Sequence, residues 1–518
     1  MPDQLDDQFA VIKVLDVSAG QFSEQHPTDA LVMPQNAASA LINVDIDALG
    51  KRKKRKGYDL IANNVGVNKV AGLIGFAPTA GTKILLMESN GVVYTWNGAA
   101  GTWTSSITLT AQDIAEFAIG GNLAFRLSQI ENVRSFNGSV WADEGNLNTD
   151  FPRAKIAFWT SNQRMLAFNT VSEPNGMYYS DTGDPQTWDR TTDLFRIGRE
   201  GDEGITGAIE FTSGDVVVFT KDNMSSINIQ DPTPANWTQA KIADIGCLAF
   251  RTLRQMGQDA LFLSDDGVRS VVQSAQDKKR GASLPISFPI QDWIDRINFT
   301  QVDKATAWVW RDKYYLAVPI DSATENSHVL VWSQRAHAAN GGKGGWSIYE
   351  NIASNAFGQI NFGNKPRVYF GDSGTGSVYM FRSSEPSEES DTDNGTNIEY
   401  QEISRAYDFG SLEVDKTYEH IEVTAISTSG NLIIDAQIEN TGFTRIAEMD
   451  LTGFLPQLPI ALPFDLGGTV LVREKFDLEQ LGRGRYIQIQ LTEDTESGDV
   501  EILSYSLAAF IENIENND

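Results

Sequence analysis

The sequence predicts an all-β protein, with a β-propeller of about seven blades between an N-terminal arm and a C-terminal antiparallel β-sandwich. The propeller is indicated by a loose repeat: a short apolar strand, a tight turn rich in Asn and Gly, and a strand that ends in an aromatic residue. The repeat returns every ~40 to 50 residues, which is the period of propeller blades. A chain of 518 residues is long enough for several domains.

The first 69 residues lack the repeat and are expected to form an arm or a small subdomain. We expect a strand at residues 9–14, followed by a polar stretch. A strand-turn-strand element then surrounds a basic run, which consists of Lys51, Arg52, Lys53, Lys54, Arg55 and Lys56.

The propeller is expected over residues 70–382. Its clearest unit is residues 83–98, where Asn90-Gly91 joins two strands and Trp96 ends the second. Asn and Gly tolerate the left-handed backbone angles that such turns need. Similar units are predicted to begin at residues 123, 165, 216, 261, 314 and 368. Six or eight blades also fit, for example if an N-terminal strand completes a blade.

One helix interrupts the strands, and the propeller ends in a polar segment. Apolar residues recur at helical spacing over residues 289–297, which predicts a short helix between the fifth and sixth units. Residues 383–395 read SSEPSEESDTDNG, so we predict an acidic linker over residues 383–396.

Residues 397–518 are expected to form the β-sandwich. Apolar and polar residues alternate there, most clearly at residues 420–425, 431–438, 486–492 and 501–510. Long alternating strands with few tryptophans suit an antiparallel sheet with one buried face. The last residues, 512–518, are expected to be a frayed acidic tail.

The charge balance limits the classes of partner. There are 41 Lys+Arg and 69 Asp+Glu, for a net charge of −28. The electrostatic field of so negative a protein repels nucleic acid from most of the surface, which argues against tight DNA wrapping. The negative charge is compatible with DNA that passes through a channel without binding to its wall. No apolar window approaches the ~18 residues of a membrane helix, and the polar, acidic start is unlike a secretory signal.

No catalytic, cofactor or metal site is predicted. The four histidines, His26, His328, His337 and His420, include no pair at a metal-binding spacing. The chain has no G-x-S-x-G motif and no Walker loop. The single cysteine, Cys247, is expected to be a buried core residue. We therefore expect a protein that is not an enzyme, although paired carboxylates of a glycosidase could meet by chance in so acidic a chain.

The basic run of residues 51–56 is the most unusual local feature. Six consecutive cations repel one another unless they are solvated or neutralised by a partner. Three functional hypotheses are a nuclear import signal, a nucleic-acid contact and a contact with an acidic neighbour. The place of the run inside a strand-turn-strand element argues against the import signal. An exposed charged edge that discourages aggregation is the structural alternative. Our working hypothesis is that the six cations form an assembly interface.

Two short motifs flank this run. They are Leu41-Ile42-Asn43-Val44-Asp45, and Gly50-Lys51-Arg52 followed by Arg55-Lys56-Gly57-Tyr58. They resemble the N-terminal signature of bacteriophage tail proteins of the nozzle, hub and stopper type, in which an NvD stretch precedes a K-R-x-G-Y turn. The basic portion is longer here than in that family. Weaker matches follow at Met177-Tyr178-Tyr179-Ser180-Asp181, Trp346 and Tyr369-Phe370-Gly371-Asp372.

The resemblance implies a structural protein of the virion, made in the host cytoplasm and located in the tail of a short-tailed phage. Such proteins form a ring, often a hexamer, below the portal and adaptor proteins, and they meet tail fibre, spike or needle proteins. Genome DNA would be retained and ejected through the ring without sequence-specific binding. Rings need heterologous contacts, which the arm and the sandwich could supply. The alternative is a receptor- or glycan-binding propeller at the tail tip, and a glycoside hydrolase is a less favoured third hypothesis.

Overall fold

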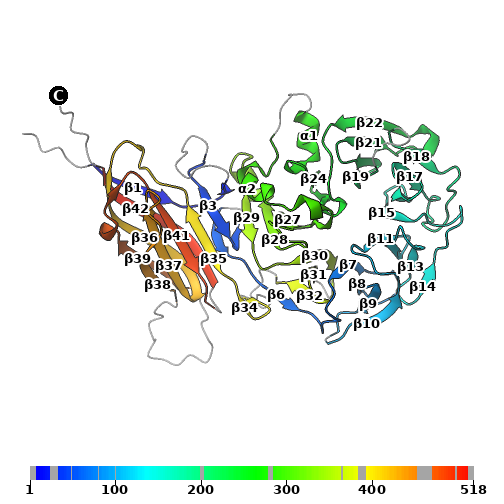
Figure 1. Cartoon of the computed structure of the whole chain (residues 1–518), viewed down its shortest axis with the longest axis horizontal. Coiled ribbons are helices and arrows are strands. Elements are labelled where there is room, and N and C mark those ends of the chain that lie inside the picture. Colours follow the sequence, from blue (N-terminus) through cyan, green and yellow to red (C-terminus); the bar gives the residue numbers. More distant parts are fainter. Residues whose placement is uncertain are drawn as a thin grey trace, which may run out of the picture.

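A computed structural model describes residues 8–23, 33–47, 50–79, 81–99, 101–198, 204–277, 284–362, 366–382, 392–451, 470–495 and 499–511. Figure 1 shows a ring of small sheets on the right and a pair of long-stranded sheets on the left. Strands dominate these residues, and the sheets of the ring form a β-propeller. The predicted all-β propeller fold is therefore confirmed.

The first four sheets of the propeller are antiparallel meanders of four strands each. The turn between two strands of the first sheet is Asn90-Gly91, with φ of 50° and 75°, the left-handed geometry that its sequence predicts. The four sheets are β7 to β10 (Val70–Phe76, Ile84–Ser89, Val92–Trp96, Thr104–Thr108), β11 to β14 (Glu116–Gly120, Leu123–Leu127, Arg134–Phe136, Trp141–Asp143), β15 to β18 (Ala154–Trp159, Met165–Thr170, Gly176–Tyr179, Leu194–Arg196) and β19 to β22 (Gly207–Thr212, Asp215–Phe219, Met224–Asn228, Thr238–Ala243).

The fifth and sixth sheets carry the helices. The fifth has three strands, β23 to β25, and helix α1 follows its last strand directly. The predicted helix between the fifth and sixth units is confirmed as α2. No helix in the described part of the chain is long and apolar enough to cross a membrane. The elements are β23 to β25 (Arg254–Met256, Asp259–Ser264, Gly267–Ser270), α1 (Val271–Asp277), α2 (Gln291–Asp295), β26 to β29 (Thr306–Trp310, Lys313–Val318, His328–Ser333, Trp346–Tyr349) and α3 (Gln334–Ala339).

The last sheet is closed by a strand from the N-terminal arm. It contains β30 (Ser354–Ile360), β31 (Arg367–Asp372) and β32 (Val378–Phe381), and its fourth strand is β6 (Tyr58–Leu60). The inner strand β30 contacts β7 of the first sheet, which completes the ring. Six of the seven sheets of the ring thus have four-stranded blades, and the fifth has three strands. The propeller, predicted over residues 70–382, also includes β6 from the predicted arm.

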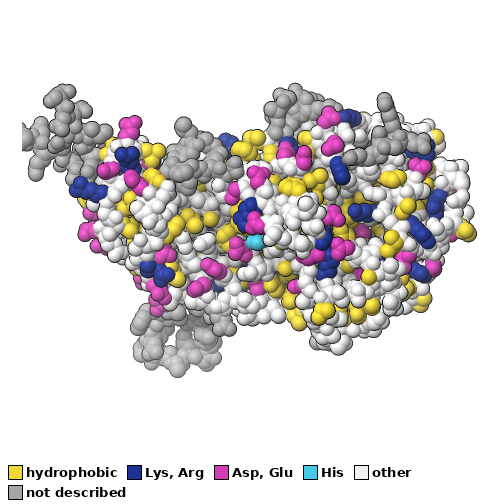
Figure 2. All heavy atoms as spheres, in the orientation of Figure 1, with side chains coloured by type: hydrophobic (Ala, Val, Ile, Leu, Met, Phe, Trp, Pro, Cys, Tyr) yellow, Lys and Arg dark blue, Asp and Glu magenta, His cyan; other side chains and the backbone are white. Residues whose placement is uncertain are grey.

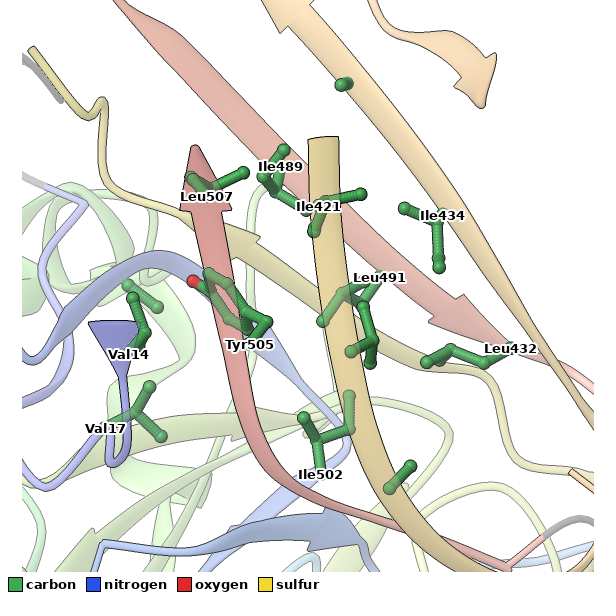
Figure 3. Packing of buried hydrophobic residues seen from close by; sticks show 14 of the residues in the cluster. Val14, Val17, Ile421, Leu432, Ile434, Ile489, Leu491, Ile502, Tyr505 and Leu507 are labelled. Carbon is green, nitrogen blue, oxygen red and sulfur yellow. The ribbon is translucent and has the colours of Figure 1, made fainter. Parts of the chain in front are cut away.

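The sandwich packs two sheets around an apolar core. Figure 3 shows side chains such as Ile421, Ile434 and Leu491 meeting between them, and all three are at most 1% exposed. One sheet contains β39 (Val470–Asp477), β36 (Lys416–Ser429), β42 (Asp499–Ile511), β5 (Arg52–Lys54) and β4 (Val44–Ile46), with β1 (Gln8–Val14) and β40 (Arg483–Gly484) at its sides. The other contains β35 (Tyr400–Ser404), β41 (Ile487–Glu493), β37 (Asn431–Ile438) and β38 (Thr444–Asp450).

A single sheet runs from the propeller into the sandwich. The outer strand of the sixth sheet, β29, pairs in parallel with β2 (Gly20–Gln21) and β3 (Ala37–Ile42), and β3 pairs antiparallel with β35. The sheet therefore has ten strands, from β26 to β38. Backbone hydrogen bonds, and not only the connecting chain, join the two parts of the protein.

Part of the predicted linker belongs to the propeller. Residues 392–397 form a hairpin of β33 (Thr392–Asp393) and β34 (Thr396–Asn397), and β33 pairs in parallel with β6. The preceding part of the predicted linker, residues 383–391, and the predicted acidic tail, residues 512–518, lie outside the described residues.

Candidate functional site

Asn43 connects the arm, the propeller and the sandwich. It lies between β3 and β4 with φ of 55°, a left-handed conformation that asparagine tolerates. Its side-chain oxygen accepts hydrogen bonds from Nε of Arg55 at 2.8 Å and from the backbone N–H of Glu350, directly after β29, at 3.0 Å. Its side-chain nitrogen donates to the carbonyl of Glu399, before β35, at 2.9 Å. One amide therefore connects three parts of the chain.

Three cations of the basic run are buried at this junction, each with one carboxylate. Successive side chains of strand β5 point to opposite faces of the sheet, so Arg52 and Lys54 point inward while Lys53 points the other way. Both members of each pair are at most 2% exposed, and a buried charge without a partner would be costly. The pairs are Arg52 Nε to Glu402 at 2.9 Å, Lys54 Nζ to Glu493 at 2.6 Å and Arg55 to Asp393 at 2.5 Å.

Tyrosines surround the innermost of these pairs. The Arg52 guanidinium lies 4.9 Å from the ring centroid of Tyr505, and the Tyr400 hydroxyl donates to Glu402 at 2.8 Å. Burial raises the pKa of Glu402, and the charge of Arg52 acts in the opposite direction. Burial alone would lower the pKa of Arg52, but Glu402 and the nearby tyrosines outweigh it and the pKa is raised. Arginine keeps its proton at neutral pH, so Arg52 provides the positive charge that favours the ionised form of Glu402.

The basic run was predicted to be an assembly interface, and this hypothesis needs correction for Arg52, Lys54 and Arg55. Because these three side chains are buried against carboxylates of their own chain, they present almost no charged surface to another protein in this fold. The other three reach the surface: Lys51 lies 3.4 Å from Glu501, Lys56 lies 3.0 Å from Asp499, and Lys53 lines a cleft.

The three buried carboxylates were missed by sequence reasoning. Asp393 was assigned to an acidic linker, and Glu402 and Glu493 fell within the predicted sandwich without being singled out. A signal did exist for Glu402, because it falls on the same side of β35 as the buried Tyr400 and Ser404. A carboxylate on the inward side of a strand indicates an internal cation.

A cleft of about 250 Å³ lies where the sixth and seventh sheets meet β4 and β5, and we call it the junction cleft. Its charged lining contains seven cations and only three carboxylates, Asp45, Asp47 and Asp312. The cations are Lys53, Arg55, Lys56, Arg311, Lys313, Arg335 and Arg382. Six aromatic side chains also line it: Trp308, Trp310, Tyr315, Tyr349, Phe357 and Phe381. A basic and aromatic lining suits an anionic ligand with apolar parts.

A second cavity, of about 400 Å³, is lined by the inner strands of the propeller. Glu116 of β11 is the only carboxylate among the described residues that line it, and it lies 3.3 Å from Arg251. Burial raises the pKa of Glu116, whereas Arg251 and Arg254 act to lower it. The cavity thus presents one carboxylate beside two guanidinium groups, and not the carboxylate pair of a typical glycosidase. Within the described residues, no cluster of three His, Cys, Asp or Glu could hold a metal ion.

No protein-family model and no curated protein matches the chain. Among solved structures, the WD40 repeats of RRP9 are 8% identical, cover 63% of this chain and 98% of their own, and give a TM-score of 0.39. BamB from Moraxella catarrhalis is 11% identical, with coverage of 59% and 95% and a TM-score of 0.34. The computationally designed Ika8 protein is 11% identical, with coverage of 62% and 99% and a TM-score of 0.35. With such low scores, the propeller assignment rests on the sheet topology.

Proposed function

We propose that this protein is a non-enzymatic structural subunit of the tail of a short-tailed phage, similar to nozzle and hub proteins. Copies of the chain form a ring, expected to be a hexamer, below the portal and adaptor proteins. Tail fibre, spike or needle proteins attach to the same assembly. Genome DNA passes through the ring without sequence-specific binding, and the virion tail is the place of action.

The observation that carries this proposal is the role of the residues on which the family resemblance rests. Asn43 of the NvD motif makes the three-way connection, and Arg55 of the turn forms the buried pair with Asp393. Gly57 lies so close to the hairpin that a Cβ there would be 1.8 Å from the carbonyl oxygen of Thr392. Tyr58 donates to the carbonyl of Asn351 at 2.9 Å. The motif therefore builds the joint between propeller and sandwich, as suits a wall component.

The charge distribution supports the same proposal. Figure 2 shows acidic and basic side chains interspersed over the face in view, without one large basic area. With a net charge of −28, few phosphates would be neutralised, so little binding energy from counterion release is available to DNA. DNA could slide past such a wall.

Electron microscopy of the purified full-length protein tests the proposal. We expect closed rings with a central hole, and native mass spectrometry should give one copy number. A gel-shift assay at about 150 mM salt should show no stable complex with duplex DNA. A protein that stays monomeric over a concentration series up to the point of precipitation would contradict the ring, and tight DNA binding would contradict the channel.

The junction cleft favours one second candidate, a receptor- or glycan-binding propeller at the tail tip. Aromatic faces and cations together can bind an acidic sugar. A glycan array probed with the full-length protein tests it: binding to uronate- or sialate-containing glycans that is lost in Trp310→Ala would support this role. No binding to any array member would leave the structural role as the better proposal.

A further inference from the structure

The junction cleft concentrates positive charge in an otherwise acidic protein. Its lining carries seven cations and three carboxylates, whereas the whole chain has 41 cations and 69 acidic residues. A second copy with a net charge of −28 is repelled by most of the surface. An acidic segment of another copy would be attracted to this cleft instead.

These cations differ in their exposure to solvent. Arg55 pairs with Asp393, and Lys313 contacts Asp45. Arg335 is different, because 66% of its side chain is exposed and its distance to Asp312 is 3.7 Å. Arg311 is exposed and Lys53 is partly exposed. Cations at the surface of the cleft can therefore meet an incoming carboxylate.

The aromatic residues of the lining indicate that a ligand of the junction cleft also carries an apolar side chain. Trp308, Trp310 and Phe381 are only partly buried, so an apolar side chain could cover them. The cleft thus fits an acidic peptide with an apolar anchor.

The C-terminal segment of the chain has both properties. Residues 511–518 read IENIENND, in which Ile511 and Ile514 stand among Glu512, Glu515 and Asp518. The acidic segment of residues 383–391 reads SSEPSEESD and has only Pro386 as an apolar residue. The C-terminal segment is therefore the better match to an aromatic and basic cleft.

Residues 512–518 follow a strand that leads away from the cleft of the same chain. Strand β42 pairs with the cleft residue Lys53 at Glu501 and then continues to Ile511. These ten residues place Ile511 roughly 33 Å along the strand from Glu501. Figure 1 shows β42 running beside β1 in the part of the sandwich away from the propeller. The seven residues that follow extend at most about 25 Å.

We propose that the junction cleft binds the acidic segment of residues 511–518 from a neighbouring copy of this chain. The contact joins two different surfaces, a cleft on one copy and a strand end on the next, so it is heterologous and can be propagated around a ring. The inference rests on the proposed ring assembly, for which it supplies the contact between subunits.

Sedimentation velocity of the full-length protein tests the contact, with Lys53→Gln/Arg335→Gln as the cleft variant. We expect the variant to need a roughly tenfold higher concentration for association, and added salt to weaken the association of the wild type. The matched control is Arg473→Gln in the sandwich, whose side chain is 67% exposed. The control should associate like the wild type, and circular dichroism should show that all three proteins are folded.

A synthetic peptide of residues 511–518 provides the second arm. In excess it should dissociate the assembly, whereas IQNIQNNN, with its carboxylates neutralised, and a peptide with Ile514→Asn should not. Unchanged association of the cleft variant together with no competition by the peptide would overturn the inference while leaving the ring intact. If the protein never associates but binds the peptide at the cleft, the result would count against the ring. It would still support the specificity of the cleft for this segment.

Discussion

The guanidinium of Arg55 donates to both carboxylate oxygens of Asp393, at 2.8 and 2.5 Å, although the two residues are 338 positions apart. Arg55 also donates to the carbonyl of Glu350 at 2.9 Å, and its guanidinium lies 5.5 Å from the ring centroid of Tyr349. This one side chain contacts the arm, the chain after the sixth sheet, and the hairpin of β33 and β34. The joint between the two parts of the protein therefore depends on it.

Replacing Arg55 with methionine should destabilise the fold strongly. The change leaves Asp393 buried without its counter-charge, for which a cost of about 3 to 5 kcal/mol in unfolding free energy is expected. Urea unfolding followed by circular dichroism measures it. The double variant Arg55→Met/Asp393→Leu should recover much of the loss, because no isolated charge remains. A single variant with the stability of the wild type would show that the pair contributes little.

Gly57→Ala should also destabilise the joint. A Cβ at position 57 would lie 1.8 Å from the carbonyl oxygen of Thr392, so the hairpin must move away, at a cost of about 1 to 3 kcal/mol. The matched control is Gly374→Ala, where the nearest atom would be 3.4 Å away. Thermal unfolding of both variants checks this, and equal midpoints for the two would contradict the close approach.

His337 should make stability depend on pH. Burial lowers the pKa of His337 below the ordinary 6.5. The carbonyl oxygen of Gly344, which lies 2.9 Å from Nδ1, acts to raise the pKa but does not cancel the effect of burial. Because the unfolded chain takes up the proton first, this contribution is present above about pH 6.5 and is lost as the pH falls. In His337→Asn, unfolding free energy should therefore decrease less between pH 7 and pH 5 than in the wild type. Parallel pH profiles would rule out this role.

Cys247 should be inert in the folded protein. It is fully buried, and burial raises the pKa of its thiol to about 12, so almost no thiolate exists at neutral pH. An aromatic disulfide reagent should label less than a tenth of the protein at pH 7.5 within an hour. The same reagent should label one thiol per chain in guanidinium chloride. Rapid labelling without denaturant would mean that this region opens readily.

Local signals predicted the blades well. Asn90-Gly91 and its counterparts specify a turn geometry that two adjacent residues determine, and apolar strands lie on either side of the turn as expected. An N-terminal strand that completes a blade, as β6 does, was only one of the blade arrangements that fitted the sequence. Tyr58 to Leu60 carry no repeat signature, and they pair with residues more than 300 positions away. The three-stranded fifth sheet was not anticipated either, because helix α1 follows β25 without a turn signal.

The sequence by itself determined the all-β character, the propeller, the sandwich and the presence of an unusual cluster of cations, because period, turn chemistry and charge are properties of neighbouring residues. Only the tertiary structure decided what the cations do. Arg52, Lys54 and Arg55 find carboxylates hundreds of residues later, and alternation reveals which side chains point inward but not which charges they meet there. The pairing of distant charges is a property of the assembled sheets.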